Sequence, residues 1–216
     1  MRDGDRSLMT VWDPLVRVLH WVLVIAFLIA YLTEDDLLTV HVWAGYVVGG
    51  VVVLRIGWGF LGPRRARFTD FVYGPRRILN YAWGLVRLRA EHRYVGHSPT
   101  GGAMVVVLLV ALSATVWSGL EVLALERGAG PLAASAASVV PVAVVAADEE
   151  HESSEAAVGE RGAERAGEEF WEELHEVAAN VTLVLVILHI AGVLLASLVY
   201  RENLVRAMFT GRKRRE

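Results

Sequence analysis

The chain has 216 residues, 55% of them hydrophobic, and a formal net charge of −3 at pH 7. A water-soluble domain of this length does not need several long apolar runs, so the composition favours an integral membrane protein. Because there is no cysteine, disulfides, thiolate-bound iron–sulfur clusters and thioether-attached haem are excluded, and histidine is the main soft metal ligand that remains.

Four apolar segments are long enough to cross a bilayer, which takes roughly 20 helical residues for about 30 Å of hydrocarbon. We expect these spans at residues 15–32, 40–61, 102–125 and 174–200. Tryptophan and tyrosine stand near their ends, as in an interfacial aromatic belt. No small-residue cleavage site follows the first run, so we interpret it as a retained span and not as a signal peptide.

The loops between these spans predict the orientation of the chain. The loop between the second and third spans and the tail after the fourth are rich in arginine, whereas the first and third loops are acidic. Cytoplasmic loops carry an excess of Lys and Arg, so both termini are predicted to be cytoplasmic. The fold class is therefore all-α: an integral membrane four-helix bundle that forms one domain over residues 1–216.

The third loop, about residues 126–172, contains a segment that complicates this count. Residues 131–147 are almost long enough to be an alternative fifth span, but they are rich in alanine and are interrupted by Pro141. Membrane insertion favours Leu, Ile, Phe and Val at the helix centre instead. We expect an outer surface segment here, followed by a solvated and mobile acidic stretch.

The arginine-rich loop contains a second ambiguous segment, at residues 74–94. Arginine alternates there with isoleucine, leucine, tyrosine and tryptophan. This pattern suits a helix that lies along the lipid headgroups. An ordinary loop with stop-transfer arginines is the alternative.

Four of the seven histidines lie in the spans or at their mouths: His20, His41, His175 and His189. Ionisable groups inside a membrane are rare and usually functional. The fourteen residues from His175 to His189 climb about 21 Å along a helix and return to within about 40° of the same face. These two imidazoles therefore cannot share one iron.

The predicted orientation sets the depth of each imidazole. One iron with two axial histidines needs ligands from different helices at similar depth. Two pairs meet both conditions: His41 with His175 on the outer side, and His20 with His189 on the inner side. The inner pair is mismatched by several ångströms, which helix tilt can absorb. The sequence thus predicts two bis-histidine haems at different levels of the bilayer.

Residues near these histidines have a functional and an ordinary interpretation. Gly45 and Gly49 share one face with His41 and would leave room for a flat macrocycle, although they also suit close packing of two helices. Arg17 and Arg55 are candidates to pair with haem propionates, and the alternative is that they extend to the headgroups.

His97 lies just before the third span, in the stretch "RYVGHSPTGG". Ser98 and Pro99 suit the start of a helix there, and His97 is not needed for that start. We therefore consider His97 as a residue that contacts a propionate or passes protons at a quinone site.

The sequence resembles the bacterial cytochrome b561 and nickel-iron-hydrogenase b-type cytochrome family in "WDPLVRVLHW", "HVWAGYVV", "RYVGHSPTGG" and "WEELHEVAANVTLVLVILHIAGV" with "RENLVRAMFTGRKR". The resemblance covers nearly the whole chain except the alanine-rich and acidic outer loop. It implies a multi-pass protein of the bacterial inner membrane with two b-type haems. It also implies that His20, His41, His175 and His189 are the haem ligands, and that electrons move between a periplasmic redox partner and membrane quinone.

The expected partners are membrane lipid, quinone and a periplasmic c-type cytochrome or other redox protein, with no nucleic acid. A basic partner would be attracted by the acidic outer loop. Quinone would react near His97 on the inside, or near Glu172 and Glu173 on the outside. Quinone oxidoreductase activity would arise together with a partner, and a homo-oligomer is plausible although no motif requires it.

Two other classes of protein also deserve comparison. A histidine-based proton or metal-ion transporter would want carboxylates in its spans, and the apolar runs contain only Glu121 and Glu176, both near outer ends. A purely structural membrane anchor would leave the four depth-matched histidines unexplained.

Overall fold

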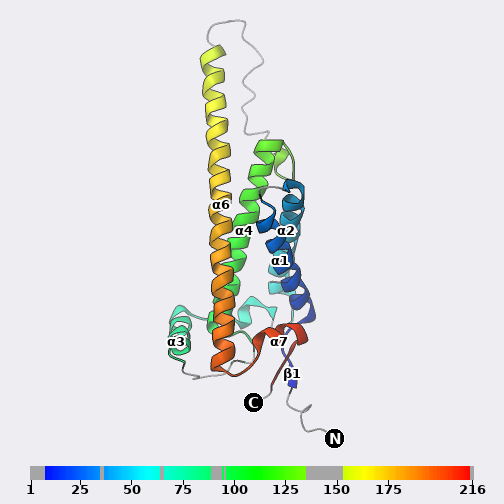
Figure 1. The fold of residues 1–216 in the computed structure, drawn as a ribbon, viewed down its shortest axis with the longest axis vertical. Helices are drawn as coiled ribbons and strands as arrows, with labels where there is room; N and C mark the ends of the chain where they lie inside the picture. Colours follow the sequence, from blue (N-terminus) through cyan, green and yellow to red (C-terminus); the bar gives the residue numbers. More distant parts are fainter. Residues whose placement is uncertain are drawn as a thin grey trace.

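The computed structural model describes residues 8–34, 37–63, 66–88, 94, 96–134 and 153–214. The elements follow in chain order as β1 (Leu8–Thr10), α1 (Pro14–Leu32), α2 (Leu38–Leu61), η3 (Phe68–Asp70), α3 (Pro75–Val86), α4 (Pro99–Arg127), α6 (Ser153–Val199), α7 (Leu204–Thr210) and β2 (Arg212–Arg214). The long helices α1, α2, α4 and α6 form an elongated bundle (Figure 1).

Among the described residues, four helices are long and apolar enough to cross a membrane: α1, α2, α4 and the part of α6 from Arg165 to Val199. They confirm the helical fold class with four candidate spans. The ends of α1, α2 and α4 fall within three residues of the expected positions. Many of their apolar side chains point outward, as lipid-facing residues do, and Val18, Ile25 and Val110 are examples with more than half of their surface exposed.

Local sequence explains where two of these helices begin. The Asp13 carboxylate accepts hydrogen bonds from the N–H groups of Leu15 at 2.9 Å and Val16 at 3.2 Å. The Ser98 hydroxyl accepts one from the N–H of Gly101 at 3.2 Å, and each cap is followed by a proline. Such caps satisfy N–H groups that have no partner within the helix, and the predicted start at Ser98 is confirmed.

Helix α6 is much longer than the expected fourth span. It begins at Ser153, whereas we expected a mobile loop up to residue 172, so this expectation is corrected for residues 153–172. Glutamate and alanine are the commonest residues of this stretch, and their high helix propensity favours a helix there despite three glycines. Residues 135–152, which include most of the alternative fifth span, lie outside the described residues.

The two ends of the described chain lie at the same end of the bundle. Strands β1 and β2 pair antiparallel, with Leu8 opposite Arg214 and Thr10 opposite Arg212. This short ladder was not anticipated and adds to the helical bundle. We call this end, where α3 and α7 also lie, the inner end, and the opposite end the outer end (Figure 1).

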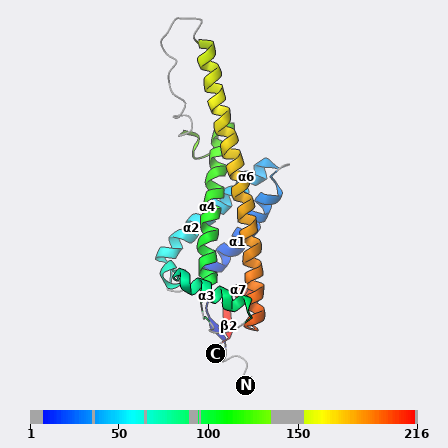
Figure 2. The same ribbon diagram turned by 90° about the vertical axis from the view of Figure 1, so that its left-hand side faces the viewer.

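A small apolar core lies between α1, α2 and α4, with buried Ala26, Phe27, Val48, Val52, Leu109 and Leu112. Along α1 this core lies between His20 and Ala30. It therefore separates the inner part of the bundle from the outer part. Helix α3 lies outside this core and runs across the long helices (Figure 2).

Candidate functional site

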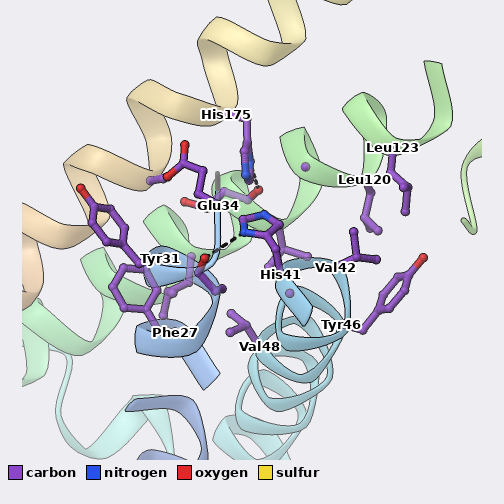
Figure 3. Close-up of a pocket in the computed structure, with 17 residues that line it drawn as sticks. Phe27, Tyr31, Glu34, His41, Val42, Tyr46, Val48, Leu120, Leu123 and His175 are labelled. Carbon is purple, nitrogen blue, oxygen red and sulfur yellow. Dashed lines mark hydrogen bonds between the residues drawn. The ribbon is translucent and has the colours of Figure 1, made fainter. Parts of the chain in front are cut away.

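His41 on α2 and His175 on α6 face one another in a cavity towards the outer end (Figure 3). Their ring centroids are 6.0 Å apart and their planes are 84° apart. The Nδ1 atom of His41 lies 2.9 Å from the carbonyl oxygen of Ala30. The Nδ1 atom of His175 lies 2.9 Å from the carbonyl oxygen of Thr115. A carbonyl oxygen accepts only from an N–H, so both contacts place the hydrogen on Nδ1 and leave the Nε2 lone pair for a metal.

Two further residues of α4, Ser118 and Gly119, lie against the His175 ring. The Ser118 hydroxyl lies 3.2 Å from Nδ1 of His175, and it donates its own hydrogen to the Ala114 carbonyl at 2.9 Å. A Cβ atom at Gly119 would lie 2.8 Å from Cε1 of His175. Only glycine therefore allows the ring to approach α4 so closely. Sequence reasoning missed both residues, although a Ser-Gly pair inside an apolar helix is a signal of close helix contact.

The two glycines predicted near His41 have different surroundings. Gly45 lines the outer cavity, and a Cβ atom there would have no neighbour within 4 Å. A Cβ atom at Gly49 would lie 3.0 Å from a methyl group of Val116. Gly45 thus leaves space in the cavity, whereas Gly49 lets α2 pack closely against α4. Close helix packing therefore describes Gly49, and room for a macrocycle beside Gly45 stays a prediction.

Tyr31 and Glu34 line the cavity near His175, at the outer end of α1 (Figure 3). The Tyr31 hydroxyl donates a hydrogen bond to Oδ1 of Asn180 at 3.0 Å, which ties α1 to α6. Glu172 and Glu173, the candidates for an outer quinone site, precede His175 on α6 and are exposed. The sequence did not predict a carboxylate in the lining of the cavity, whereas the structure places Glu34 there.

The second pair, His20 on α1 and His189 on α6, lies at the inner level. Its ring centroids are 6.4 Å apart and its planes are 56° apart. In contrast to the outer pair, Nδ1 of His20 is buried and has no hydrogen-bond partner among the described residues. The edge of Trp21 packs on His20, with 5.2 Å between the centroids. The structure thus brings the four predicted histidines together in the two expected pairs.

Several buried donors of the inner halves of α1 and α2 have no acceptor within the described part of the chain: Nε of Arg17, Nε1 of Trp21, Nη1 of Arg55 and Nε1 of Trp58. Leaving a buried polar group unpaired costs about 1–3 kcal/mol. A shared excess of donors, two of them on cationic side chains, fits a bound anion such as a carboxylate.

The two arginines also have partners in the protein. Nη1 of Arg17 donates to the carbonyl of Phe209 on α7 at 2.6 Å. The guanidinium of Arg55 is buried and lies 5.4 Å from the centroid of Phe68 and 5.9 Å from that of Phe71. Extension to the headgroups, the ordinary interpretation, does not suit a side chain as buried as Arg55.

His97 does not lie against either histidine pair. Its ring packs edge-on against Trp12, with 4.7 Å between centroids, and lies 4.4 Å from the centroid of Phe71. Phe71 in turn contacts the Arg55 guanidinium. The Phe71 ring therefore lies between His97 and the group of donors at the inner end. Its contact with a propionate or quinone stays a prediction.

The spacing of the histidine pairs is suited to a metal with two axial imidazoles. Metal–nitrogen distances of about 2 Å on opposite sides of one ion put the ring centroids about 6–6.5 Å apart. The described residues contain no group of three or more His, Cys, Asp or Glu side chains that could hold a metal. The pairs therefore fit a metal that brings its own equatorial ligands, as haem iron does.

The sequence was compared with protein-family models, with curated proteins and with solved structures. The family model for prokaryotic cytochrome b561 matches residues 11–211, which include all four histidines. No curated protein and no solved structure gives a match.

Proposed function

The chain belongs to the prokaryotic cytochrome b561 family, and on that premise we propose that it carries electrons through two b-type haems between a periplasmic redox partner and membrane quinone. The family and the four apolar helices make it a multi-pass membrane cytochrome that binds haem b and transfers electrons. The number of haems, the partners and the inner membrane as its location are our proposals.

One observation supports two haems above all: the histidines form two separate pairs of nearly equal spacing, 6.0 Å and 6.4 Å between centroids. When bound, each haem supplies a one-electron carrier whose potential depends on its axial ligands, hydrogen bonds and burial. The apolar core around Phe27 and Leu112 lies between the two levels.

The residues at each level have different tasks in this proposal. His41 and His175 would hold the outer iron through Nε2, because their Nδ1 atoms already meet backbone carbonyls. His20 and His189 would hold the inner iron. Arg17 and Arg55 would neutralise the propionates at that level, and the Gly45 position leaves space beside the outer pair.

The charge distribution supports the orientation and the class of partner. We place the arginine-rich end and both termini in the cytoplasm, following the positive-inside rule. The outer part of α6 carries an acidic cluster at and beyond the mouth of the expected span, namely Glu168, Glu169, Glu172, Glu173 and Glu176. A basic c-type cytochrome would be steered towards this cluster and the nearby outer haem. Quinone would react at the inner end beside His97 or at the outer end beside Glu172 and Glu173.

Purified protein in proteoliposomes tests this function. A quinol analogue should reduce both haems, seen as a growing α-band, and a basic cytochrome c outside should reoxidise them faster than an acidic one. This preference should weaken with salt, because the Debye length falls from about 10 Å at 0.1 M to about 3 Å at 1 M. Haems that no quinol reduces would contradict the proposal.

Variants then separate the two candidate quinone sites. His97→Ala should slow reduction by quinol if the site is at the inner end. Glu172→Gln with Glu173→Gln should slow it if the site is at the outer end. Neither change touches an axial histidine, so the haem content serves as the control for correct folding. An unchanged rate in both variants would exclude both sites.

A further inference from the structure

Helix α3 is amphipathic, and large apolar side chains on one side of it are exposed. Its inward side packs on α4 and α6, where Leu85 is buried. The Tyr81 hydroxyl shares hydrogen bonds with Tyr200, just after α6, and Ser98, the cap of α4. Burial and the hydrogen bond to Tyr200 raise the pKa of the Tyr81 hydroxyl above its ordinary value. These contacts fix how α3 is rotated about its own axis.

The outward side of α3 carries a stripe of large apolar residues. Leu79, Trp83 and Val86 are 68%, 59% and 66% exposed. At about 100° per residue they fall within about 60° of one another on the helix. Because α3 runs across the long helices at the inner end (Figure 2), this stripe would meet the boundary between acyl chains and headgroups rather than the bilayer centre.

Two arginines border this stripe on the same side. Arg76 and Arg87 are exposed, and both lie about 60–80° from Leu79 around the helix. The guanidinium of Arg87 lies 4.5 Å from the centroid of Trp83, so the cation is held beside the stripe. The sequence has no Asp or Glu between Asp70 and Glu91 to neutralise these charges. The apolar stripe therefore has an uncompensated cationic edge.

We propose that α3 is a binding surface for anionic phospholipid of the leaflet at the arginine-rich end, with Leu79, Trp83 and Val86 among the acyl chains and Arg76 and Arg87 on the lipid phosphates. Charge complementarity favours this occupant, because clusters of arginine at a membrane surface attract anionic lipids. The apolar stripe favours a lipid over a soluble anion, because only the acyl chains of a lipid would bury it. The surface is separate from both histidine pairs, so the inference does not depend on the number of haems.

Native mass spectrometry of the full haem-loaded protein tests this surface. The protein, in detergent micelles at low salt, is titrated with phosphatidylglycerol and, separately, with phosphatidylcholine. Wild type should bind the first phosphatidylglycerol more tightly than phosphatidylcholine. The Arg76→Gln, Arg87→Gln double variant should lose about fivefold in that preference per arginine, and about 25-fold in total.

Two matched variants make the result specific. Arg76→Lys with Arg87→Lys keeps both charges and should retain most of the preference. Arg206→Gln with Arg212→Gln removes two exposed arginines of the same end and should change the preference less than twofold. The proposal is overturned if wild type does not prefer phosphatidylglycerol, or if both glutamine variants lose the preference equally. Unchanged haem spectra show that each variant is folded.

Discussion

The outer and inner histidine pairs have nearly the same spacing but very different surroundings. At the outer pair, each Nδ1 lies 2.9 Å from a backbone carbonyl, and Gly119 lets α4 approach the His175 ring. At the inner pair, Nδ1 of His20 and four neighbouring donors find no acceptor within the described residues. The polypeptide alone orients the outer rings, whereas the inner site has more buried donors than the described residues satisfy.

This difference indicates how each level would respond to its cofactor. Hydrogen bonds at Nδ1 fix the tautomer and the orientation of an imidazole, so His41 and His175 are preorganised for ligation. The inner donors are costly while unpaired, at about 1–3 kcal/mol for each. An anionic group would offset that cost, so the inner end should gain more stability from bound haem than the outer end does.

The largest expected effect tests the preorganisation of the outer pair. Gly119→Val places side-chain atoms where a Cβ atom alone would already lie 2.8 Å from the His175 ring. The ring must move, and we expect outer haem affinity to fall about 100-fold, as for loss of a strong supporting contact. Haem per chain should drop from two towards one.

A matched glycine of α2 provides the control for this change. Gly50 is exposed, and a Cβ atom there would have no neighbour within 4 Å. Gly50→Val should therefore keep both haems. If Gly119→Val also keeps both, the close approach of α4 to His175 is not needed for the outer site.

The next effect concerns the excess of donors at the inner pair. Arg55→Gln removes a buried cation, and a nearby cation favours the reduced state because reduction adds an electron. The potential of the inner haem should fall by about 60 mV, which corresponds to about 1.4 kcal/mol for one electron. Potentiometric titration should show the outer haem unchanged.

An exposed arginine of the same end calibrates this result. Arg206 lies on α7 and is exposed, so Arg206→Gln should shift the inner potential far less, since solvent screens its charge. Equal shifts in the two variants would mean that Arg55 acts only through the overall charge of the inner end.

The smallest effect returns to the outer pair. Ser118→Ala removes one of the two acceptors near Nδ1 of His175 and leaves the Thr115 carbonyl in place. With one acceptor fewer at Nδ1, the His175 imidazole becomes less basic. The reduction potential of the outer haem should therefore rise by about 20 mV, equivalent to about 0.5 kcal/mol. A shift in the potential of the inner haem instead would contradict the assignment of His175 to the outer pair.

Much of this arrangement was predictable because it depends on helix geometry. Rise per residue and the direction of each span were enough to match His41 with His175 and His20 with His189. Helix α6 begins before the expected span because the acidic stretch at its start is rich in alanine and glutamate, which have high helix propensity. The ligation itself stays a prediction, since the structure supplies the spacing and not the iron.

The residues that sequence reasoning missed act across helices. Gly119 matters only because the His175 ring of α6 approaches it. The carbonyls of Ala30 and Thr115 carry no side-chain signal, because every residue has one. Arg17 was expected to meet a propionate or the headgroups, yet it also donates to the carbonyl of Phe209, a residue 192 positions away in the sequence. Such contacts depend on how helices dock, which the hydrophobic pattern does not specify.

The most direct test of the two-level account is a reduced-minus-oxidised visible spectrum with haem quantified per chain, for wild type, His175→Ala and His20→Ala. The account predicts two b-type haems in wild type and one in each variant. The remaining haem should have a different potential in the two variants, because a different level is left. One haem in wild type, or loss of the same haem in both variants, would contradict the account.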